Sequence, residues 1–174
     1  MTRQISTATV TGKSQNRTAL GMMHAYLKKY PNTTLSELRA KFYKQNVCPD
    51  TGMDELFLTH QEIEQGKNGP RSKWYIAESA CFVGDGEWLV LGDGQKVGFN
   101  KMWTGESLAI LQQEMLQYQI FGQVDKSCKG KNGFDITYEY ESQSKVETSA
   151  GMPIWVWIIG AAILLALAAY FFMN

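Results

Sequence analysis

Two segments of the chain combine glycine, cationic side chains and aromatic residues in a pattern that suits recognition of an anion. Residues 66–73 (GKNGPRSK) lead into Trp74, and residues 126–133 (KSCKGKNG) lead into Phe134. Glycine lets backbone N–H groups approach an anion, lysine and arginine supply charge, and aromatic rings can stack on a nucleobase. We therefore predict an anionic small ligand at one or both loops, with these candidate residues: Lys67, Arg71, Lys73, Trp74, Lys129 and Lys131. The alternative is that Asn-Gly forms a hairpin turn and that the lysines keep this turn soluble.

A second cationic set lies near the N-terminus. Although the net charge of the chain is zero, residues 1–50 hold eight basic residues against Glu37 and Asp50. A basic half can face a nucleic acid or an acidic partner protein, or it can complement the acidic half of the same chain. If nucleic acid is the partner, the residues expected to contact phosphates are Lys28, Lys29, Arg39, Lys41 and Lys44.

Signals for catalysis are weak. His60 stands close to Glu62 and Glu64, but this spacing matches no strong metal-binding pattern. The three cysteines, among them Cys48, form no Cys-x-x-Cys pair. Asp50 would suit a metal-dependent nuclease only with a downstream acid-x-Lys, which the sequence lacks. We therefore expect no enzyme, no metal and no cofactor, and an enzyme using His60, Glu62, Glu64 or Cys48 is the least supported alternative.

The segment 153–173 (PIWVWIIGAAILLALAAYFFM) contains no charged residue. A bilayer core is about 30 Å thick and takes roughly 20 apolar residues as a helix. The sequence thus predicts a tail-anchored, single-pass membrane protein. Its N-terminal domain would be cytoplasmic, at the inner membrane if the source is bacterial. Small residues let membrane helices pack closely, which predicts a homo-oligomer through Gly160, Ala162, Ala166 and Ala169.

Local patterns predict the elements that would position these residues. Apolar side chains at three- and four-residue steps favour a helix from Arg17 to Tyr30. Thr34 with Glu37 three positions later predicts a capping box at the start of a second helix. A third helix is expected from Gly105 to about Gly122. Residues 46–69 are ambiguous between a strand with a turn and a short helix.

Aromatic and β-branched runs predict the strands. These runs are residues 74–76, 81–83, 88–91 and 97–99, and Asp-Gly turns at 85–86 and 93–94 favour an antiparallel meander. Residues 134–141 alternate apolar and polar side chains, which predicts a half-buried strand paired with the meander.

The fold class is therefore α+β: two N-terminal helices, a short antiparallel β-meander, a third helix, a final strand and one transmembrane helix. A winged-helix-like arrangement is the alternative, which the helix between the later strands does not suit. The expected organisation is a flexible polar arm (1–16), an α+β domain (17–141), a polar linker (142–152) and the membrane segment (153–173).

These observations favour a binding or sensor module that recognises an anionic ligand or a partner protein and signals by clustering at the membrane. A bacterial antiviral defence effector is a special case of this architecture. The alternative function is a membrane-tethered nucleic-acid-binding protein that uses the basic N-terminal helices.

Overall fold

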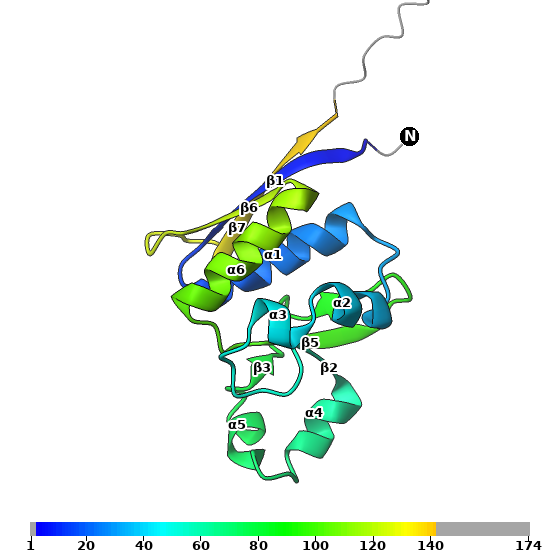
Figure 1. Ribbon diagram of the computed structural model, residues 1–174, viewed down its shortest axis with the longest axis vertical. Helices are drawn as coiled ribbons and strands as arrows, with labels where there is room; N and C mark the ends of the chain where they lie inside the picture. Colours follow the sequence, from blue (N-terminus) through cyan, green and yellow to red (C-terminus); the bar gives the residue numbers. More distant parts are fainter. Residues whose placement is uncertain (1–2, 142–174) are drawn as a thin grey trace, which may run out of the picture. The chain divides into compact units, whose positions relative to one another are not determined.

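The computed structural model describes residues 3–141, which form one compact unit of mixed α and β structure and confirm the α+β class (Figure 1). The strands and helices follow in the order β1 (Ile5–Gly12), α1 (Gln15–Lys29), α2 (Leu35–Lys41), α3 (Lys44–Val47), β2 (Phe57–Thr59), α4 (His60–Gly66), α5 (Ser72–Ile76), β3 (Cys81–Phe82), β4 (Leu89–Val90), β5 (Lys96–Asn100), α6 (Gly105–Met115), the 3₁₀ turn η1 (Leu116–Tyr118), β6 (Ile120–Val124) and β7 (Phe134–Tyr140).

The first sheet has the strand order β6-β1-β7. Its central strand, β1, lies in the segment predicted as a flexible polar arm, so that prediction is wrong. Ala8 and Val10 of β1 are buried, while Thr9 between them is exposed. The buried residues are Ile5, Ala8, Val10 and Gly12, and threonines alternate with the last three of them. Two of these four are small, so the strand appears polar in the sequence although its β-branched residues favour a strand.

Strand β7 is confirmed as a half-buried strand with one polar face, but its predicted pairing is wrong. It pairs antiparallel with β1, not with the meander, and Thr9 lies opposite Thr137. On the other side of β1, β6 runs parallel, with Val10 opposite Gly122. Segments from both ends of the described chain thus complete one sheet.

Helix α1 covers the inner face of this sheet, and α6 packs against α1 and β6 (Figure 1). The predicted helix at 17–30 is confirmed with a start two residues earlier. The predicted helix from Gly105 ends sooner than expected. Helix α6 and η1 stop at Tyr118, Gln119 adopts a left-handed backbone conformation (φ 56°), and β6 follows.

The second sheet contains β2-β5-β3, with β4 also paired to β5. The turn at residues 92–94 joins β4 to β5 as the predicted hairpin. The turn at 84–86 does not, because β3 and β4 both pair with β5 rather than with each other. The predicted strand at residues 74–76 is also wrong, since these residues lie in the short helix α5.

Two short helices begin with complete capping boxes. Thr34 and Glu37 cap α2 as predicted, and Thr59 and Glu62 cap α4 in the same way. The ambiguous region 46–69 contains both expected elements, because β2 leads directly into α4.

The main hydrophobic core joins both sheets, since it includes Val10 of the first and Phe57 and Phe99 of the second. A second, smaller cluster lies beneath α4 and α5 and includes Leu58, Ile63 and Cys81.

The prediction of a membrane-anchored protein needs correction. Within residues 3–141, no helix is both long enough and apolar enough to cross a membrane. The longest of these helices, α1, has 15 residues and spans about 22 Å, less than the roughly 30 Å of a bilayer core. The segment 153–173, its packing residues and the linker 142–152 lie outside the described residues.

Candidate ligand-binding site

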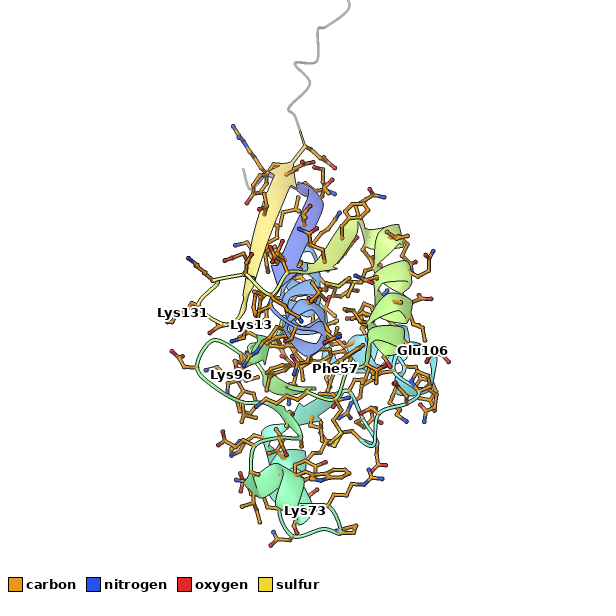
Figure 2. All side chains as sticks on the ribbon, turned by 90° about the vertical axis from the view of Figure 1, so that its left-hand side faces the viewer. Lys13, Phe57, Lys73, Lys96, Glu106 and Lys131 are labelled. Atoms are coloured by element: carbon orange, nitrogen blue, oxygen red, sulfur yellow. The ribbon has the colours of Figure 1, made fainter. Side chains whose placement is uncertain are left out.

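The two glycine- and lysine-rich loops predicted to bind an anion lie far apart on the described unit. Residues 66–73 connect α4 to α5, whereas residues 126–133 connect β6 to β7. Figure 2 shows Lys73 at one end, and Lys131 far from it beside Lys13. The structure therefore does not bring the two loops together into one site.

Most of the charge on loop 66–73 is already neutralised. The Lys67 ammonium lies 2.6 Å from a carboxylate oxygen of Glu64, and the Arg71 guanidinium lies 3.1 Å from one of Asp54. Arg71 also lies over the ring of Trp74, at 5.7 Å from its centroid. Within residues 3–141, only Lys73 of the three cations on this loop has no partner for its side chain.

Loop 126–133 is braced against the end of β1 on both sides. The amide of Asp125 donates to the carbonyl of Gly12, and the amide of Lys13 donates to the carbonyl of Gly133, each at 2.9 Å. The side chain of Asn132 donates to the carbonyl of Gly86 at 2.9 Å. These bonds hold the backbone of the loop in place.

Four lysine side chains surround this braced loop, and we refer to them as the basic loop cluster: Lys13, Lys126, Lys129 and Lys131. All four are exposed. Among the residues that the structure describes, none of these ammonium groups has a hydrogen-bond or ion-pair partner. The cluster is thus a cationic surface on a fixed scaffold.

The cations of the N-terminal helices do not form one surface. Lys29 donates to the carbonyls of Ser6 and Tyr118, at 2.6 and 2.8 Å. Arg39 binds Glu62 and the carbonyl of Phe57.

The remaining three cations of this set face different neighbours. Lys28 lies over the ring of Tyr138, and Lys44 donates to the carbonyl of Pro49. Within residues 3–141, neither the Lys28 nor the Lys41 ammonium has a hydrogen-bond or ion-pair partner. The predicted nucleic-acid contacts are therefore dispersed, and several are occupied by internal bonds.

A pocket of about 370 Å³ lies where the C-terminal end of α1 meets α2 and η1. We call it the tyrosine pocket. It is lined by Tyr26, Lys29, Tyr30, Pro31, Asn32, Thr33, Glu37, Lys41 and Tyr118. Its volume falls within the range of about 300–1,000 Å³ that is typical of small-molecule sites.

Three tyrosine rings form the aromatic part of this pocket. The centroids of Tyr26 and Tyr30 are 4.9 Å apart, and both rings meet Tyr118 nearly edge-on, at 5.0 and 5.7 Å. Tyr26 is anchored further by the edge of Phe42 at 5.0 Å. The rings are therefore fixed by mutual packing, while Tyr30 keeps 37% of its surface exposed to a ligand.

The tyrosine hydroxyls remain protonated at neutral pH. Burial, helped by the neighbouring Tyr118, raises the pKa of Tyr26 to about 12. Burial also raises the pKa values of Tyr30 and Tyr118. The hydroxyls of the more exposed Tyr30 and Tyr118 can thus donate a hydrogen bond to an acceptor in the pocket.

The charge in the pocket is weakly positive. Lys29 and Lys41 contribute two ammonium groups, and Glu37 contributes one carboxylate. That carboxylate is engaged at the N-terminus of α2, where it accepts hydrogen bonds from the amide and hydroxyl of Thr34 at 2.8 and 3.0 Å. Lys41 lies close enough for its charge to act on Glu37, but it forms no close ion pair among the described residues and can also meet a ligand group of opposite charge.

Three of the residues considered for catalysis make contacts within the domain. Glu62 caps α4 and pairs with Arg39. Asp50 accepts hydrogen bonds from Ser107 and Thr104 at the start of α6. Burial raises the pKa of the nearby Cys48 thiol, which makes it a poor nucleophile. Within residues 3–141, no group of three or more His, Cys, Asp or Glu side chains is placed to hold a metal ion.

Sequence reasoning missed the tyrosines as site residues. Tyr26 and Tyr30 are four positions apart on one helix, which places them on the same face, and Pro31 and Asn32 follow. This spacing is compatible with a shared binding surface, but it is equally typical of two residues that pack in the core. Tyr118 comes from a distant part of the chain, so only the folded structure completes the pocket.

Comparison with known protein families, with curated proteins and with solved structures finds no match to this chain.

Proposed function

We propose that residues 3–141 form a binding domain for a small anionic ligand that carries a planar ring. The single observation that carries this proposal is the tyrosine pocket, where three packed aromatic rings and Lys41 line one cavity, and the Lys41 ammonium has no hydrogen bond or close ion pair within residues 3–141. Aromatic rings offer a stacking surface worth about 1–3 kcal/mol per base, and an ammonium group selects for negative charge. A mononucleotide has both features.

The rigidity of the pocket supports the same proposal. Tyr26 is almost completely buried and is fixed by three aromatic neighbours. Lys29 is held by two backbone carbonyls, so its charge is fixed as well. A site whose side chains are already ordered loses less conformational entropy when it binds a ligand.

The test is calorimetric titration of the full chain with adenosine monophosphate, adenosine and inorganic phosphate. We expect the nucleotide to bind more tightly than either of its parts. Tyr30→Ala should weaken nucleotide binding about tenfold or more because it removes a stacking ring. Lys41→Gln should weaken binding and reduce its dependence on salt.

Two matched controls separate the pocket from general effects of these substitutions. Tyr43 is also exposed, but it does not line the pocket, and Lys73 is a partnerless lysine at the far end of the described unit. Tyr43→Ala and Lys73→Gln should leave binding unchanged. Equal losses in control and pocket variants, or no binding of the nucleotide by the wild-type chain, would refute the proposal.

The basic loop cluster favours a second candidate function, the binding of a polyanion. Three of its lysines lie on a loop that is braced on β1, and Lys13 follows directly after β1; none of the four has a hydrogen-bond or ion-pair partner among the described residues. Each contact between a lysine and a phosphate contributes to affinity in a salt-dependent way.

Inorganic triphosphate tests this second candidate without involving an aromatic ring. Lys131→Glu should weaken its binding at low salt, because the substitution replaces attraction by repulsion. The matched control is Lys73→Glu on the other loop, which should have no effect. If both variants bind triphosphate as the wild type does, the cluster is only a solvated surface.

A further inference from the structure

A second cavity, of about 170 Å³, lies between α4, α5 and the segment that joins β3 to β4. Its lining residues are His60, Ile63, Glu64, Lys67, Tyr75, Glu78, Ala80, Cys81, Val83 and Trp88. The cavity is separate from the tyrosine pocket, and the two share no residue.

Three of the lining side chains are aromatic. The rings of His60 and Trp88 have centroids 6.3 Å apart and planes inclined by 50°. Tyr75 packs so closely on Gly66 that a Cβ atom there would lie 2.7 Å from its ring atoms. The apolar floor comes from Ala80 and Cys81, both buried. Aromatic rings that converge at an angle on a small space can surround a compact cation.

Of the charged side chains that line this cavity, one carboxylate has no paired cation. The ammonium of Lys67 and the carboxylate of Glu64 neutralise each other at 2.6 Å. Glu78 also lines the cavity, and within residues 3–141 its carboxylate has no hydrogen-bond or ion-pair partner. Glu78 is exposed, and the Lys101 ammonium is bonded to its backbone carbonyl rather than to its carboxylate, so the carboxylate can still face a cation in the cavity.

The backbone at Glu78 is in an unfavourable conformation for a glutamate. Its φ is 52°, in the left-handed region that glycine favours, two residues after the end of α5. The turn is held by bonds from the amides of Ser79 and Ala80 to the carbonyl of Trp74, and by Lys101, which donates to the Glu78 carbonyl at 2.7 Å. Strained positions of this kind gather at functional sites.

We propose that this cavity binds a small alkylammonium cation, with His60, Tyr75 and Trp88 around the cation and the Glu78 carboxylate as its counter-ion. A cavity of this volume holds a trimethylammonium-sized group but not a nucleotide. This site is independent of the proposed function of the tyrosine pocket.

The experiment is calorimetric titration of the full chain with choline and with the uncharged analogue in which carbon replaces its nitrogen. We expect choline to bind and the analogue to bind at least about tenfold more weakly, because cation–π attraction and the carboxylate both require the charge. Trp88→Leu should weaken choline binding by a similar factor.

Glu78→Gly separates a binding role from a structural one. Glycine relieves the backbone at this position, so the melting temperature of the variant should stay the same or rise. Choline affinity should nevertheless fall by up to about fivefold, the loss expected for an exposed charge pair, and Glu78→Gln, which keeps the shape without the charge, should show the same loss. Glu139→Gln, an exposed carboxylate on β7, is the matched control and should bind like the wild type.

Three results would overturn the proposal. These are equal affinities for choline and its uncharged analogue, unchanged affinity in Glu78→Gly, and no choline binding by the wild-type chain. Because adenosine monophosphate is not used here, none of these outcomes affects the test of the tyrosine pocket.

Discussion

At the scale of single residues, Arg17 and His24 connect α1 to loops from distant parts of the chain. Arg17 forms an ion pair with Glu87, donates to the carbonyl of Asn132 at 3.0 Å, and lies 4.6 Å above the ring of Phe82. Two turns further along α1, the ring of His24 stacks on Phe134 at 5.3 Å. These two side chains hold the β3–β4 segment and the start of β7 against the same helix.

His24 makes the stability of the protein depend on pH. Its Nε2 atom is buried without a partner, and burial lowers the pKa of its imidazole despite a smaller opposing effect of the Glu87 backbone. Below the ordinary histidine pKa of 6.5, the unfolded chain therefore binds a proton that the folded chain resists. The free energy of unfolding should fall as the pH drops below about 6.5.

The variant His24→Phe keeps the stacked ring but cannot bind a proton. In urea denaturation at several pH values between 7 and 5, it should lose less stability than the wild type. If the free energy of unfolding falls equally with pH in both proteins, His24 does not contribute to this pH dependence.

At the scale of elements, the turn from β1 to α1 depends on a close approach of backbones. A Cβ atom on Gly12 would lie 2.6 Å from the Cα atom of Thr18, which belongs to the backbone of α1 and cannot rotate away. The hydroxyl of Thr18 in turn donates to the carbonyls of Ser14 and Gln123, so it joins the helix to β6. The packing of α1 against β1 and β6 therefore requires glycine at position 12.

Gly12→Ala should destabilise the domain by about 1–3 kcal/mol, the range typical of overpacking in a well-packed interior. Gly105→Ala is the matched control. Gly105 is the first residue of α6, and a Cβ atom there would meet nothing within 4 Å. This control should be neutral or stabilise by up to about 1 kcal/mol. Denaturant melts of the two variants decide the question, and similar stabilities would contradict the packing argument.

At the scale of the whole described unit, one core stabilises two sheets, and a smaller cluster supports the lobe that contains the second cavity. Phe99 of β5 packs against Phe57 and Trp103, both at 5.4 Å between centroids, in the core that also includes Val10 of β1. The cluster around Leu58 and Ile63 is smaller, and helix α5 above it contains no fully buried residue. A smaller buried apolar surface means weaker hydrophobic stabilisation.

Native-state hydrogen exchange should therefore show two regions of the unit that differ in the free energy of opening. Amides of β1, α1 and β5 are expected to exchange only through global unfolding, because they belong to the shared core. Amides of α4 and α5 should exchange through a local opening of lower free energy, while the rest of the described unit stays folded. If choline slows exchange in this lobe alone, that result also supports the second cavity as its site. Uniform exchange across both regions would instead show that the lobe unfolds together with the core.

The sequence by itself determined the features whose physics is local. The apolar stripe of α1 repeats within the helix, and the capping box at Thr34 involves a residue only three positions away. The alternation in β7 also shows in the sequence, because each strand residue faces one side or the other.

Only the tertiary structure decided which segments meet. Strand β1 was missed because its buried face consists of the small residues Ala8 and Gly12 beside Val10, and their burial depends on α1. The apolar run at 74–76 favours a strand locally, but it packs as a helix on the second cluster. The tyrosine pocket needs Tyr118 from η1, and the second cavity needs Trp88 beside His60. Pairing and site formation depend on contacts between residues far apart in the chain, and these contacts leave no local pattern from which to predict them.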